Sequence, residues 1–390
     1  MINELRGKKI AVIENGLLST YTMREGLMLA LLREGCEVHI ITHTNKFVAQ
    51  VEKLGLKVHN VGSGNMNPFK VAQYIFNVRR TLQKIKPGVC LTFSIRPAIW
   101  GNLITRQLQI PTITNITGVG PLFTSKNFVY RMARTMYRNA LSKTEKVFFQ
   151  NADDMNLFLE RKFVKAAIAE TLPGSGVDYN KFKPRIFKEK DHEIFIFLFI
   201  GRLIKDKGIF EFFEAAKCIK KKYPHTHFHI IGPFWTQTLK KNTITHSQLQ
   251  NRIDEGIIDY LGEKKDVRKF IAEADCIVLP SYREGTSNIL LEAASMEKPV
   301  VTTNTTGCKE IVEDGITGLL CRVKDEKDLG AKMETMLLLS EEKRIAMGKK
   351  ARQKIIREYD KQIVVNAYLK AIKEAIPQNQ KQFAELPSYK

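Results

Sequence analysis

The sequence predicts an α/β protein built from two doubly wound domains, and three observations support this fold class. Strand-like and helix-like patterns alternate along most of the chain, which indicates parallel sheets covered by helices. The alternation breaks once, at residues 172–184, where Gly and Pro mark a turn-rich connection. The chain has 390 residues, more than a single hydrophobic core usually serves, so two domains are expected.

The first half of the chain carries the pattern of one complete sheet. Helix-period segments such as TMREGLMLALLREG and FKVAQYIFNVRRTLQKIKPG separate short apolar or β-branched runs. These runs predict strands at residues 9–14, 37–42, 89–94, 112–117 and 146–150. We therefore expect an N-terminal Rossmann-like domain over residues 1–183.

After the connection the alternation starts again. Helices are expected at 208–223 and 267–274, between further apolar runs. The runs predict strands at residues 194–201, 227–232, 257–262, 276–280 and 299–303. This gives a C-terminal domain over residues 184–360. The last segment, residues 361–390, is expected to form a helix that packs back toward the N-terminal domain, followed by a tail.

Composition excludes several classes of protein. The longest apolar run, residues 194–200, is far shorter than the roughly 18 residues of a membrane span. The first residues lack a signal-peptide core, and the six cysteines form no C-x-x-C pair. These features indicate a cytoplasmic protein with reduced thiols.

The formal charge is strongly positive and uneven. The net charge is +21, and residues 1–183 contain 26 Lys or Arg against 12 Asp or Glu. Such a surface attracts nucleic acid, anionic lipid or a phosphorylated ligand, and charge alone does not choose among them.

One loop combines acids with a helix start. Glu284 and Gly285 follow the strand at 276–280, and a helix is expected to begin near Ser287. A helix N-terminus favours anions, and each carboxylate can accept two hydrogen bonds from sugar hydroxyls. Glu284 could then bind a sugar and Glu292 a ribose. The ordinary alternative is a helix whose acids only complement its dipole.

A second loop is basic. Gly201, Arg202 and Lys207 lie between the strand at 194–201 and the next helix. Gly201 allows close approach of a backbone, and the two cations could neutralise a diphosphate leaving group. The ordinary alternative is an exposed basic turn. Since carboxyl ends of parallel strands meet at one edge, both loops should face the same crevice.

Taken together, GRLIKDKG, EGTSNILLEA, the linker GVDYNKF and TGLL resemble the family 4 retaining glycosyltransferases over nearly the whole chain. The resemblance implies a GT-B fold, in which two Rossmann-like domains face each other across a cleft. It implies that the domain at 1–183 binds the acceptor and the domain at 184–360 the nucleotide sugar. It also implies that Arg202, Lys207 and Glu284 are catalytic. The donor-binding residues it implies are Gly16, Gly201, Arg202, Lys207, Glu284, Gly285, Thr286, Ser287, Asn288, Ile289 and Glu292.

Two further segments indicate which branch of the family the chain resembles. NMNPFK at 65–70 and TGVG at 117–120 resemble the branch that builds bacterial lipid-linked oligosaccharides, capsule or O-antigen. Many family members have a histidine after the fourth strand of the first domain, where this chain has Thr117. The resemblance then implies that the acceptor hydroxyl attacks the face from which the diphosphate leaves. A leaving-group oxygen takes its proton, and Arg202 and Lys207 stabilise the charge.

The basic first half suggests where an acceptor binds. Residues 126–146 mix aromatic, aliphatic and basic side chains, which is typical either of a helix on an anionic membrane or of an ordinary amphipathic helix. We expect the N-terminal domain to dock on the cytoplasmic face of the inner membrane. Arg24, Arg96 and Thr117 are the candidate acceptor-binding residues, with the two arginines near the phosphates of a polyprenyl-diphosphate-linked saccharide.

The expected function is a metal-independent, retaining transfer of a hexose or N-acetylhexosamine, preferably N-acetylgalactosamine, from a UDP-sugar. The chain has no D-x-D, GxGxxG or P-loop, so no metal or other cofactor is expected. The HTHFH segment at 225–229 has same-face spacing, but its apolar continuation favours an ordinary strand. Two alternatives remain open: a non-hydrolysing UDP-sugar 2-epimerase, and a basic nucleic-acid-binding protein, although no nucleic-acid module is recognisable.

Overall fold

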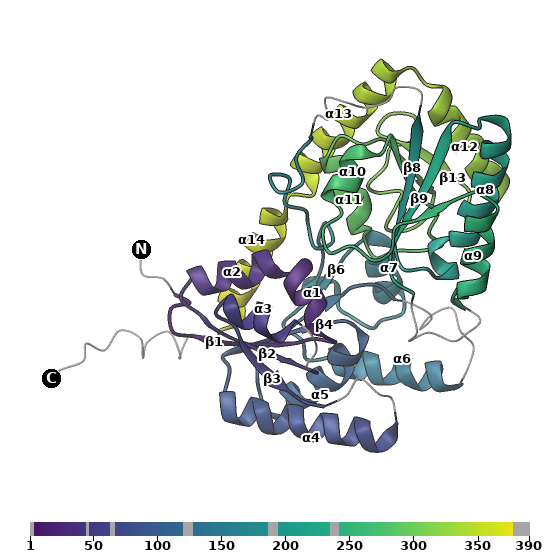
Figure 1. Ribbon diagram of the computed structural model, residues 1–390. Helices are drawn as coiled ribbons and strands as arrows, with labels where there is room; N and C mark the ends of the chain where they lie inside the picture. Colours follow the sequence, from purple (N-terminus) through teal and green to yellow (C-terminus); the bar gives the residue numbers. More distant parts are fainter. Residues whose placement is uncertain are drawn as a thin grey trace. The chain divides into compact units, whose positions relative to one another are not determined.

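The computed structural model describes residues 4–43, 47–62, 67–119, 128–185, 194–234 and 242–376 (Figure 1). The chain forms two compact units. Unit 1 comprises Met1–Ser175 with Lys361–Lys390, and unit 2 comprises Gly176–Asp360. The division lies after Ser175, whereas the sequence pattern placed it after residue 183. The predicted α/β class is confirmed, because each unit has one parallel sheet with helices.

Unit 1 contains a seven-stranded sheet in the order β3-β2-β1-β4-β5-β6-β7, with every neighbouring pair parallel. The strands are β1 (Lys9–Ile13), β2 (Glu37–Thr42), β3 (Lys57–Asn60), β4 (Val89–Phe93), β5 (Thr112–Ile116), β6 (Lys146–Phe149) and β7 (Ala169–Thr171). The strand order reverses between β1 and β4. In open sheets of this kind, ligands bind beyond the carboxyl ends at that reversal.

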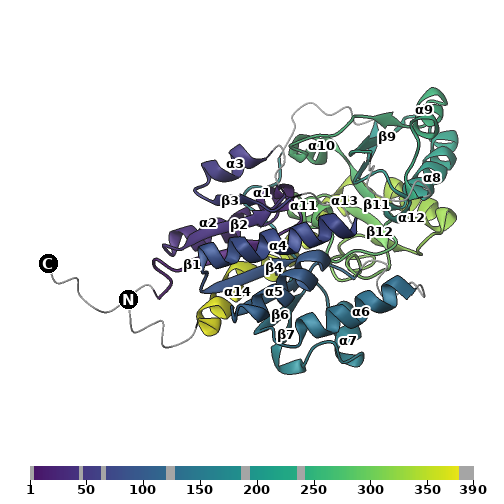
Figure 2. The ribbon, with the colours of Figure 1, turned by 90° about the horizontal axis from the view of Figure 1, so that it is seen from below.

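The helices of unit 1 cover both faces of its sheet. They are α1 (Leu17–Thr22), α2 (Glu25–Arg33), α3 (Val48–Lys53), α4 (Pro68–Ile85), α5 (Asn102–Gln107), α6 (Phe128–Leu141), α7 (Ala152–Glu160) and α14 (Lys361–Ala375), with short turns η1 (Pro97–Gly101) and η3 (Ala166–Ile168). Figure 2 views the side on which α4, α5 and α6 lie. Neighbouring members of this layer are in contact.

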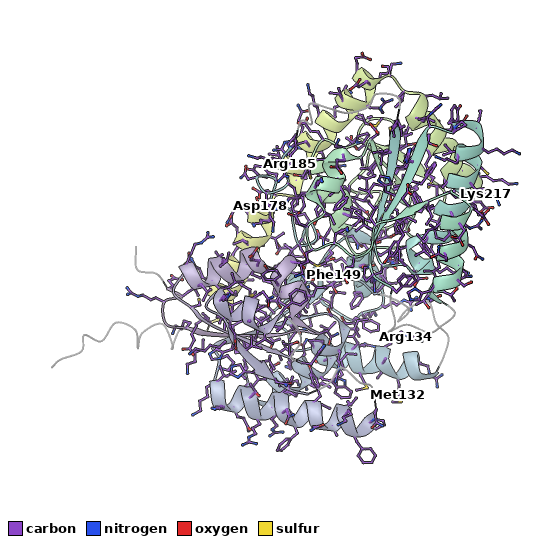
Figure 3. The ribbon with its side chains drawn as sticks, in the orientation of Figure 1. Met132, Arg134, Phe149, Asp178, Arg185 and Lys217 are labelled. Atoms are coloured by element: carbon purple, nitrogen blue, oxygen red, sulfur yellow. The ribbon has the colours of Figure 1, made fainter. Side chains whose placement is uncertain are left out.

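Alternation along β1 divides the core of unit 1 between the two faces. Ile10 and Val12 belong to a buried cluster with residues of α2 and α14, whereas Ala11 and Ile13 pack with α4. A third cluster lies under α6 and α7 and includes Phe149 (Figure 3). The C-terminal helix α14 is therefore an integral layer of unit 1, although it follows unit 2 in the sequence.

Unit 2 contains a six-stranded parallel sheet in the order β10-β9-β8-β11-β12-β13. The strands are β8 (Phe195–Ile200), β9 (Thr226–Ile231), β10 (Asp259–Tyr260), β11 (Cys276–Leu279), β12 (Val300–Thr303) and β13 (Leu319–Cys321). The helices are α8 (Ile209–Lys222), α9 (His246–Asp254), α10 (Arg268–Glu273), α11 (Asn288–Ser295), α12 (Glu326–Leu338) and α13 (Glu341–Glu358), with the single turn η4 (Lys205–Lys207).

All ten predicted strands are present, and three further strands were missed. The missed strands are β3, β7 and β13, each of three or four residues and each at the edge of its sheet. The strand predicted at 257–262 is also shorter, since only Asp259–Tyr260 pairs. The partly solvated strands β3 and β7 lack the apolar run that reveals a central strand, whereas β13 is apolar but has only three residues, too few for a recognisable run. Among the described helices, none is both long and apolar enough to cross a bilayer.

Candidate functional site

The basic loop after β8 is tightly folded. It makes the single turn η4, which ends at Gly208 with a φ of 73°. A Cβ at Gly208 would clash with the carbonyl oxygen of Pro280, so only glycine fits between this loop and the end of β11. A hydrogen bond of 2.9 Å from the backbone N–H of Tyr282 to the carbonyl of Asp206 joins the loops again. The two loops predicted to face one crevice are therefore in contact.

This contact brings Lys207 and Glu284 together. Lys207 Nζ donates to Glu284 Oε1 in a mostly buried ion pair, with side chains 17% and 13% exposed. Ser281 Oγ donates to the same carboxylate oxygen over 2.6 Å. Charge-assisted hydrogen bonds of this kind hold both partners in a fixed orientation. Arg202 is exposed in the same loop.

Gly201 was expected to allow close approach of a backbone, but among the described residues no backbone atom lies close to the position of an added Cβ there. A Cβ there would meet Phe199 and Leu279 only at ordinary contact distances, between 3.6 and 3.9 Å. The tight approach is made by Gly232, whose φ is 154° and whose added Cβ would clash with the Gly201 carbonyl. Gly232 was missed, although the Gly-Pro pair at the end of its strand is a recognisable turn signal.

The loop after β12 holds the Glu284 loop and was also missed. Thr303 and Thr305 donate their hydroxyl hydrogens to the carbonyls of Ser281 and Tyr282, the latter over 3.0 Å. The backbone N–H of Glu284 donates to Thr306 O over 3.0 Å. These bonds satisfy backbone groups that a loop would otherwise leave unpaired. The TTNTTG sequence at 302–307, which overlaps the end of β12, carries no sequence signal specific to this role.

Gly307 completes this support. Its φ is 81°, and its carbonyl accepts the backbone N–H of Ser287 over 3.0 Å. A Cβ at Gly307 would lie 2.6 Å from the carbonyl carbon and oxygen of Glu284. Real Cβ atoms do not approach a backbone so closely, so the position of Glu284 depends on glycine here.

Helix α11 begins beside these loops, as predicted. Asn288 is its first residue and Ser287 its N-cap residue, with no side-chain cap bond, and Thr286 and Ile289 lie on either side. Gly285, in the loop before it, is half-buried. The first turn therefore presents backbone N–H groups, which favour an anion.

Glu292 lies one turn further along α11 and is half-buried. Burial raises the pKa of its carboxyl to about 8, against an opposing effect from Lys181. Near neutral pH the free protein therefore keeps a proton on this group, which can donate as well as accept a hydrogen bond. Within the described parts of the chain, no hydrogen bond or ion pair joins Glu292 to Lys207 or Glu284.

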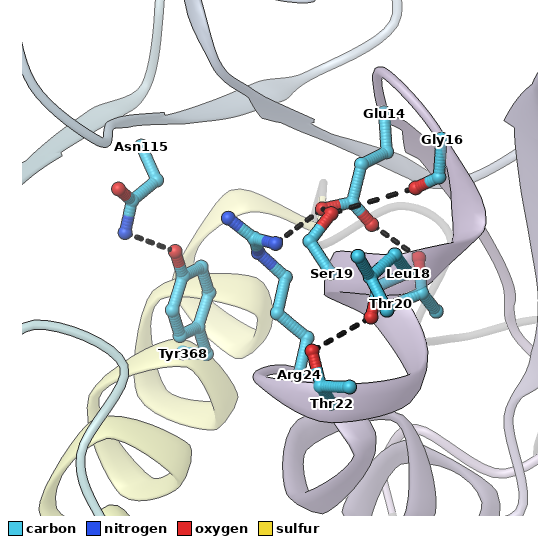
Figure 4. Close-up of polar contacts among 9 residues, drawn as sticks. All are labelled: Glu14, Gly16, Leu18, Ser19, Thr20, Thr22, Arg24, Asn115 and Tyr368. Atoms are coloured by element: carbon cyan, nitrogen blue, oxygen red, sulfur yellow. Dashed lines mark hydrogen bonds and ion pairs between the residues drawn. The ribbon is translucent and has the colours of Figure 1, made fainter. Parts of the chain in front are cut away.

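The first loop of unit 1 is fixed by a buried charge cluster (Figure 4). The Glu14 carboxylate follows β1 and accepts hydrogen bonds from Ser19 Oγ, over 2.7 Å, and from Thr20 Oγ1. It also pairs with Arg24, whose guanidinium lies 4.2 Å from the centroid of the Phe93 ring. This network encloses the turn at Gly16, where φ is 130° and α1 begins.

The buried ion pair with Glu14 gives Arg24 a structural role in unit 1. Its charge is already compensated inside unit 1, where the residue is only 7% exposed. Removing a buried arginine from such a pair costs far more than removing a surface cation. The expected contact between Arg24 and an acceptor phosphate stays a prediction, whereas its role in holding the Glu14 loop follows from the contacts.

Arg96 and Thr117 lie at the same edge of the sheet. Arg96 follows β4 and its guanidinium lies 4.1 Å from the centroid of the Tyr74 ring. Thr117 follows β5, which pairs with β4, and is half-buried. His43, directly after β2, was missed. Burial lowers its pKa, and the charge of Arg96 acts in the same direction. An isolated histidine after a strand gives no sequence signal that separates it from a core residue.

Among the described residues, neither the loop after β8 nor the loop after β11 contains a group of three potential metal ligands. In the part of the chain that the structure describes, the one grouping of three potential metal ligands is His227, His229 and Asp259, on β9 and β10. The loops after β8 and β11 combine cations with single carboxylates, a combination suited to a diphosphate and to hydroxyl groups.

The two Rossmann-like parallel sheets define a GT-B protein. A glycosyltransferase from Rickettsia africae ESF-5 has a similar structure, with a TM-score of 0.74 and 19% identity over 95% of this chain and 98% of that one. Anabaena Alr3699/HepE in complex with UDP-glucose is also similar, with a TM-score of 0.77 and 16% identity over 94% of this chain and 100% of that one. At this identity the similarity concerns the fold.

Sequence comparison then identifies the family. Residues 180–354 match the model of glycosyl transferases group 1, and residues 9–151 match that of glycosyl transferase 4-like domains. Each model covers one of the two units, so the chain is a glycosyltransferase with a glycosyl transferase 4-like domain in unit 1 and a group 1 domain in unit 2. It is 25% identical over 93% of its length to N,N'-diacetylbacillosaminyl-diphospho-undecaprenol alpha-1,3-N-acetylgalactosaminyltransferase of Campylobacter jejuni, of which it covers 97%.

Two further relatives have related activities. The chain is 24% identical, over 88% of its length and 91% of the relative's, to the capsular polysaccharide biosynthesis glycosyltransferase CapM of Staphylococcus aureus. It is 25% identical, over 76% of its length and 78% of the relative's, to UDP-Gal:alpha-D-GlcNAc-diphosphoundecaprenol alpha-1,3-galactosyltransferase of Escherichia coli. The predicted resemblance is confirmed, and so is the prediction that the protein is a glycosyltransferase.

Proposed function

We propose that this glycosyltransferase moves a hexose or N-acetylhexosamine, preferably N-acetylgalactosamine, from a UDP-sugar to a polyprenyl-diphosphate-linked saccharide, with retention and without a metal. Such a step serves the assembly of a bacterial surface polysaccharide or a glycoprotein glycan. The Lys207–Glu284 pair carries the proposal, because it places a cation and a sugar-binding acid side by side at the strand ends. The activities of the Campylobacter jejuni and Escherichia coli relatives, as their names describe them, support this acceptor and an N-acetylgalactosamine or galactose donor.

Each donor-site residue has a role that its chemistry supports. Lys207 and Arg202 would bind the diphosphate and stabilise the negative charge that develops as it leaves. Glu284 would accept hydrogen bonds from sugar hydroxyls, and Glu292 would bind the ribose. Amides at the start of α11 would bind sugar or phosphate oxygens. In the free protein Glu284 compensates the charge of Lys207. Donor binding would divide the lysine's hydrogen bonds between carboxylate and phosphate.

Retention follows from an attack on the face from which the diphosphate leaves. The alpha linkages in the relatives' names support this stereochemistry. Thr117 offers no basic imidazole, so a leaving-group oxygen would take the proton of the acceptor hydroxyl. Catalysis would then rest on positioning and on the charges of Lys207 and Arg202.

A transfer assay tests this proposal. Lys207→Ala and Glu284→Ala should each abolish transfer while leaving a folded protein, and EDTA should not inhibit the wild type. Full transfer activity in either variant would overturn the site. Incubation of the donor without acceptor separates the alternative enzyme, since a 2-epimerase would convert the UDP-sugar to its isomer.

The acceptor's lipid would place unit 1 on an anionic membrane at the cytoplasmic face of the inner membrane. Between Glu52 and Glu145 the sequence has fourteen Lys or Arg and no Asp or Glu, and this stretch includes α4, α5 and α6. On α4, Phe69 is 86% exposed and Phe76 is 63% exposed. Exposed phenylalanines on a basic helix suit an interface of apolar chains and anionic headgroups.

The segment 126–146 contributes only in part to this surface. Lys126 and Asn127 lie outside the described residues. Tyr137 and Leu141 of α6 are buried against the sheet, as in an ordinary amphipathic helix. Met132 projects from α6 and is 53% exposed (Figure 3). The apolar part of the proposed surface therefore lies mainly on α4.

Vesicle flotation tests the membrane surface. Wild type should float with phosphatidylglycerol vesicles and not with neutral ones, and Phe69→Ala/Phe76→Ala should reduce flotation. Leu338→Ala/Ile345→Ala, which removes exposed aliphatic residues of unit 2 (65% and 46% exposed), should float like wild type. Equal flotation of the phenylalanine variant would refute the assignment to α4. A gel shift with RNA and DNA tests the nucleic-acid alternative.

A further inference from the structure

Two histidines of unit 2 share one face of β9. His227 and His229 alternate with Phe228, which is fully buried in the core on the opposite face. His229 pairs in register with Asp259, the first residue of the edge strand β10. Directly opposite residues of paired strands place their side chains on the same face of a sheet. The pairing therefore adds a carboxylate to two imidazoles that the sequence separates from it by thirty residues or more.

The distances between the side-chain nitrogens of the two histidines and the carboxylate of Asp259 match those between ligands of one metal ion. Asp259 Oδ2 lies 3.6 Å from His229 Nε2 and 3.7 Å from His227 Nδ1, and the three atoms lie within 4.8 Å of one another. These distances are too long for hydrogen bonds. Ligands about 2.0–2.2 Å from a tetrahedral zinc ion are about 3.4 Å apart. The carboxylate oxygen is thus separated from both nitrogens by the distance that a shared ion requires.

The local charge also favours a cation, despite the net charge of +21. Asp259 and Glu273 both act on His229 in the direction that attracts a positive charge. A neutral imidazole binds a metal through the lone pair of one ring nitrogen, and this face of the sheet supplies two such rings beside one carboxylate. The three side chains are 40%, 25% and 56% exposed, which leaves access for the ion and for water as a further ligand.

We propose that His227, His229 and Asp259 bind one divalent transition-metal ion of the zinc type. Two imidazoles and one carboxylate suit zinc and its neighbours in the transition series, whereas magnesium and calcium prefer oxygen ligands alone. The ion would link β10, which pairs through only two residues, to the middle of β9. Its role would be structural and independent of the donor loops, so the proposal does not rest on the proposed function.

Zinc titration of the chelator-treated full chain tests the site. A Cys218→Ser background removes the exposed thiol, since the other five cysteines are buried. We expect saturable binding of one zinc per chain and a rise in Tm on zinc addition. Both effects should be lost in His227→Ala/His229→Ala and in Asp259→Asn. His225→Ala is the matched control, because this exposed histidine precedes β9, and it should bind zinc like the background protein.

Two results would overturn the proposal. One is the lack of saturable zinc binding in the background protein. The other is equal binding in the double-histidine variant and in His225→Ala. Circular dichroism of the metal-free variants shows whether they fold, and Asp259→Asn, which nearly preserves the side-chain shape, keeps the test valid if the double variant does not. Glycosyl transfer should be the same with and without zinc, since Lys207 and Glu284 lie in other loops.

Discussion

Replacing Gly307 by alanine tests how the loop after β12 positions Glu284. Left-handed backbone costs a residue with a Cβ about 1–2 kcal/mol, and Gly307 has a φ of 81°. In addition, the new Cβ would lie 2.6 Å from the Glu284 carbonyl carbon and oxygen, so the Glu284 loop must shift. A misplacement of about 1 Å in an active site can lower the rate on the order of a hundredfold.

Gly256→Ala provides the matched control. Gly256 has a φ of 67°, but a Cβ there would meet nothing within 4 Å. It should therefore lose only the conformational cost of about 1–2 kcal/mol and keep full transfer activity. Gly307→Ala should lose more stability in urea and about a hundredfold in transfer rate under conditions where it is folded.

The transfer rates of the two glycine variants decide whether the β12 loop positions Glu284. Equal transfer rates for folded Gly307→Ala and Gly256→Ala would show that the position of Glu284 does not depend on the β12 loop. The reasoning from the close approach would then be wrong, whatever the two variants do to stability.

Two further predictions concern buried polar groups. Because burial raises the pKa of folded Glu292 from 4.5 to about 8, wild-type stability should fall as pH rises through this window; Glu292→Gln should remove that dependence. Urea unfolding at pH 5 and pH 8 measures this pH dependence. A difference in unfolding free energy between wild type and Glu292→Gln that does not change with pH would contradict the prediction. Tyr368→Phe concerns the hydrogen bond between α14 and β5. The substitution removes the oxygen that accepts a 2.7 Å hydrogen bond from Asn115 Nδ2, so it should lower the free energy of unfolding by about 1–3 kcal/mol. Unchanged urea unfolding would argue against α14 being held to β5 in this way.

The central strands could be predicted because burial on both faces leaves a direct mark in the sequence. Cys276–Leu279 is buried at every position, and its apolar run was recognised. The edge strand Lys57–Asn60 is partly exposed throughout and was not. The boundaries of edge strands depend on the neighbour with which they pair, and a single sequence does not contain that information.

Some residues of the candidate site could also be predicted from the sequence, and others could not. Lys207 and Glu284 could be found because each follows a buried strand, where parallel sheets place their ligand-binding loops. Thr303 and Gly307 could not, since their roles depend on the register that pairs Leu279 with Thr302. Arg24 was recognised as a cation, but its compensation by Glu14 arises only when the turn between them folds.

Calorimetric titration of UDP-N-acetylgalactosamine into wild type, Lys207→Ala and Lys205→Ala measures whether Lys207 binds the donor. Lys205 is an exposed lysine in the same loop and controls for the loss of one positive charge. Loss of a charged hydrogen bond, worth about 1.5–3 kcal/mol, should weaken donor binding by Lys207→Ala on the order of 10- to 150-fold. Lys205→Ala should bind like wild type. Equal donor affinity in wild type and Lys207→Ala would show that Lys207 does not bind the donor and that the proposed donor site is wrong.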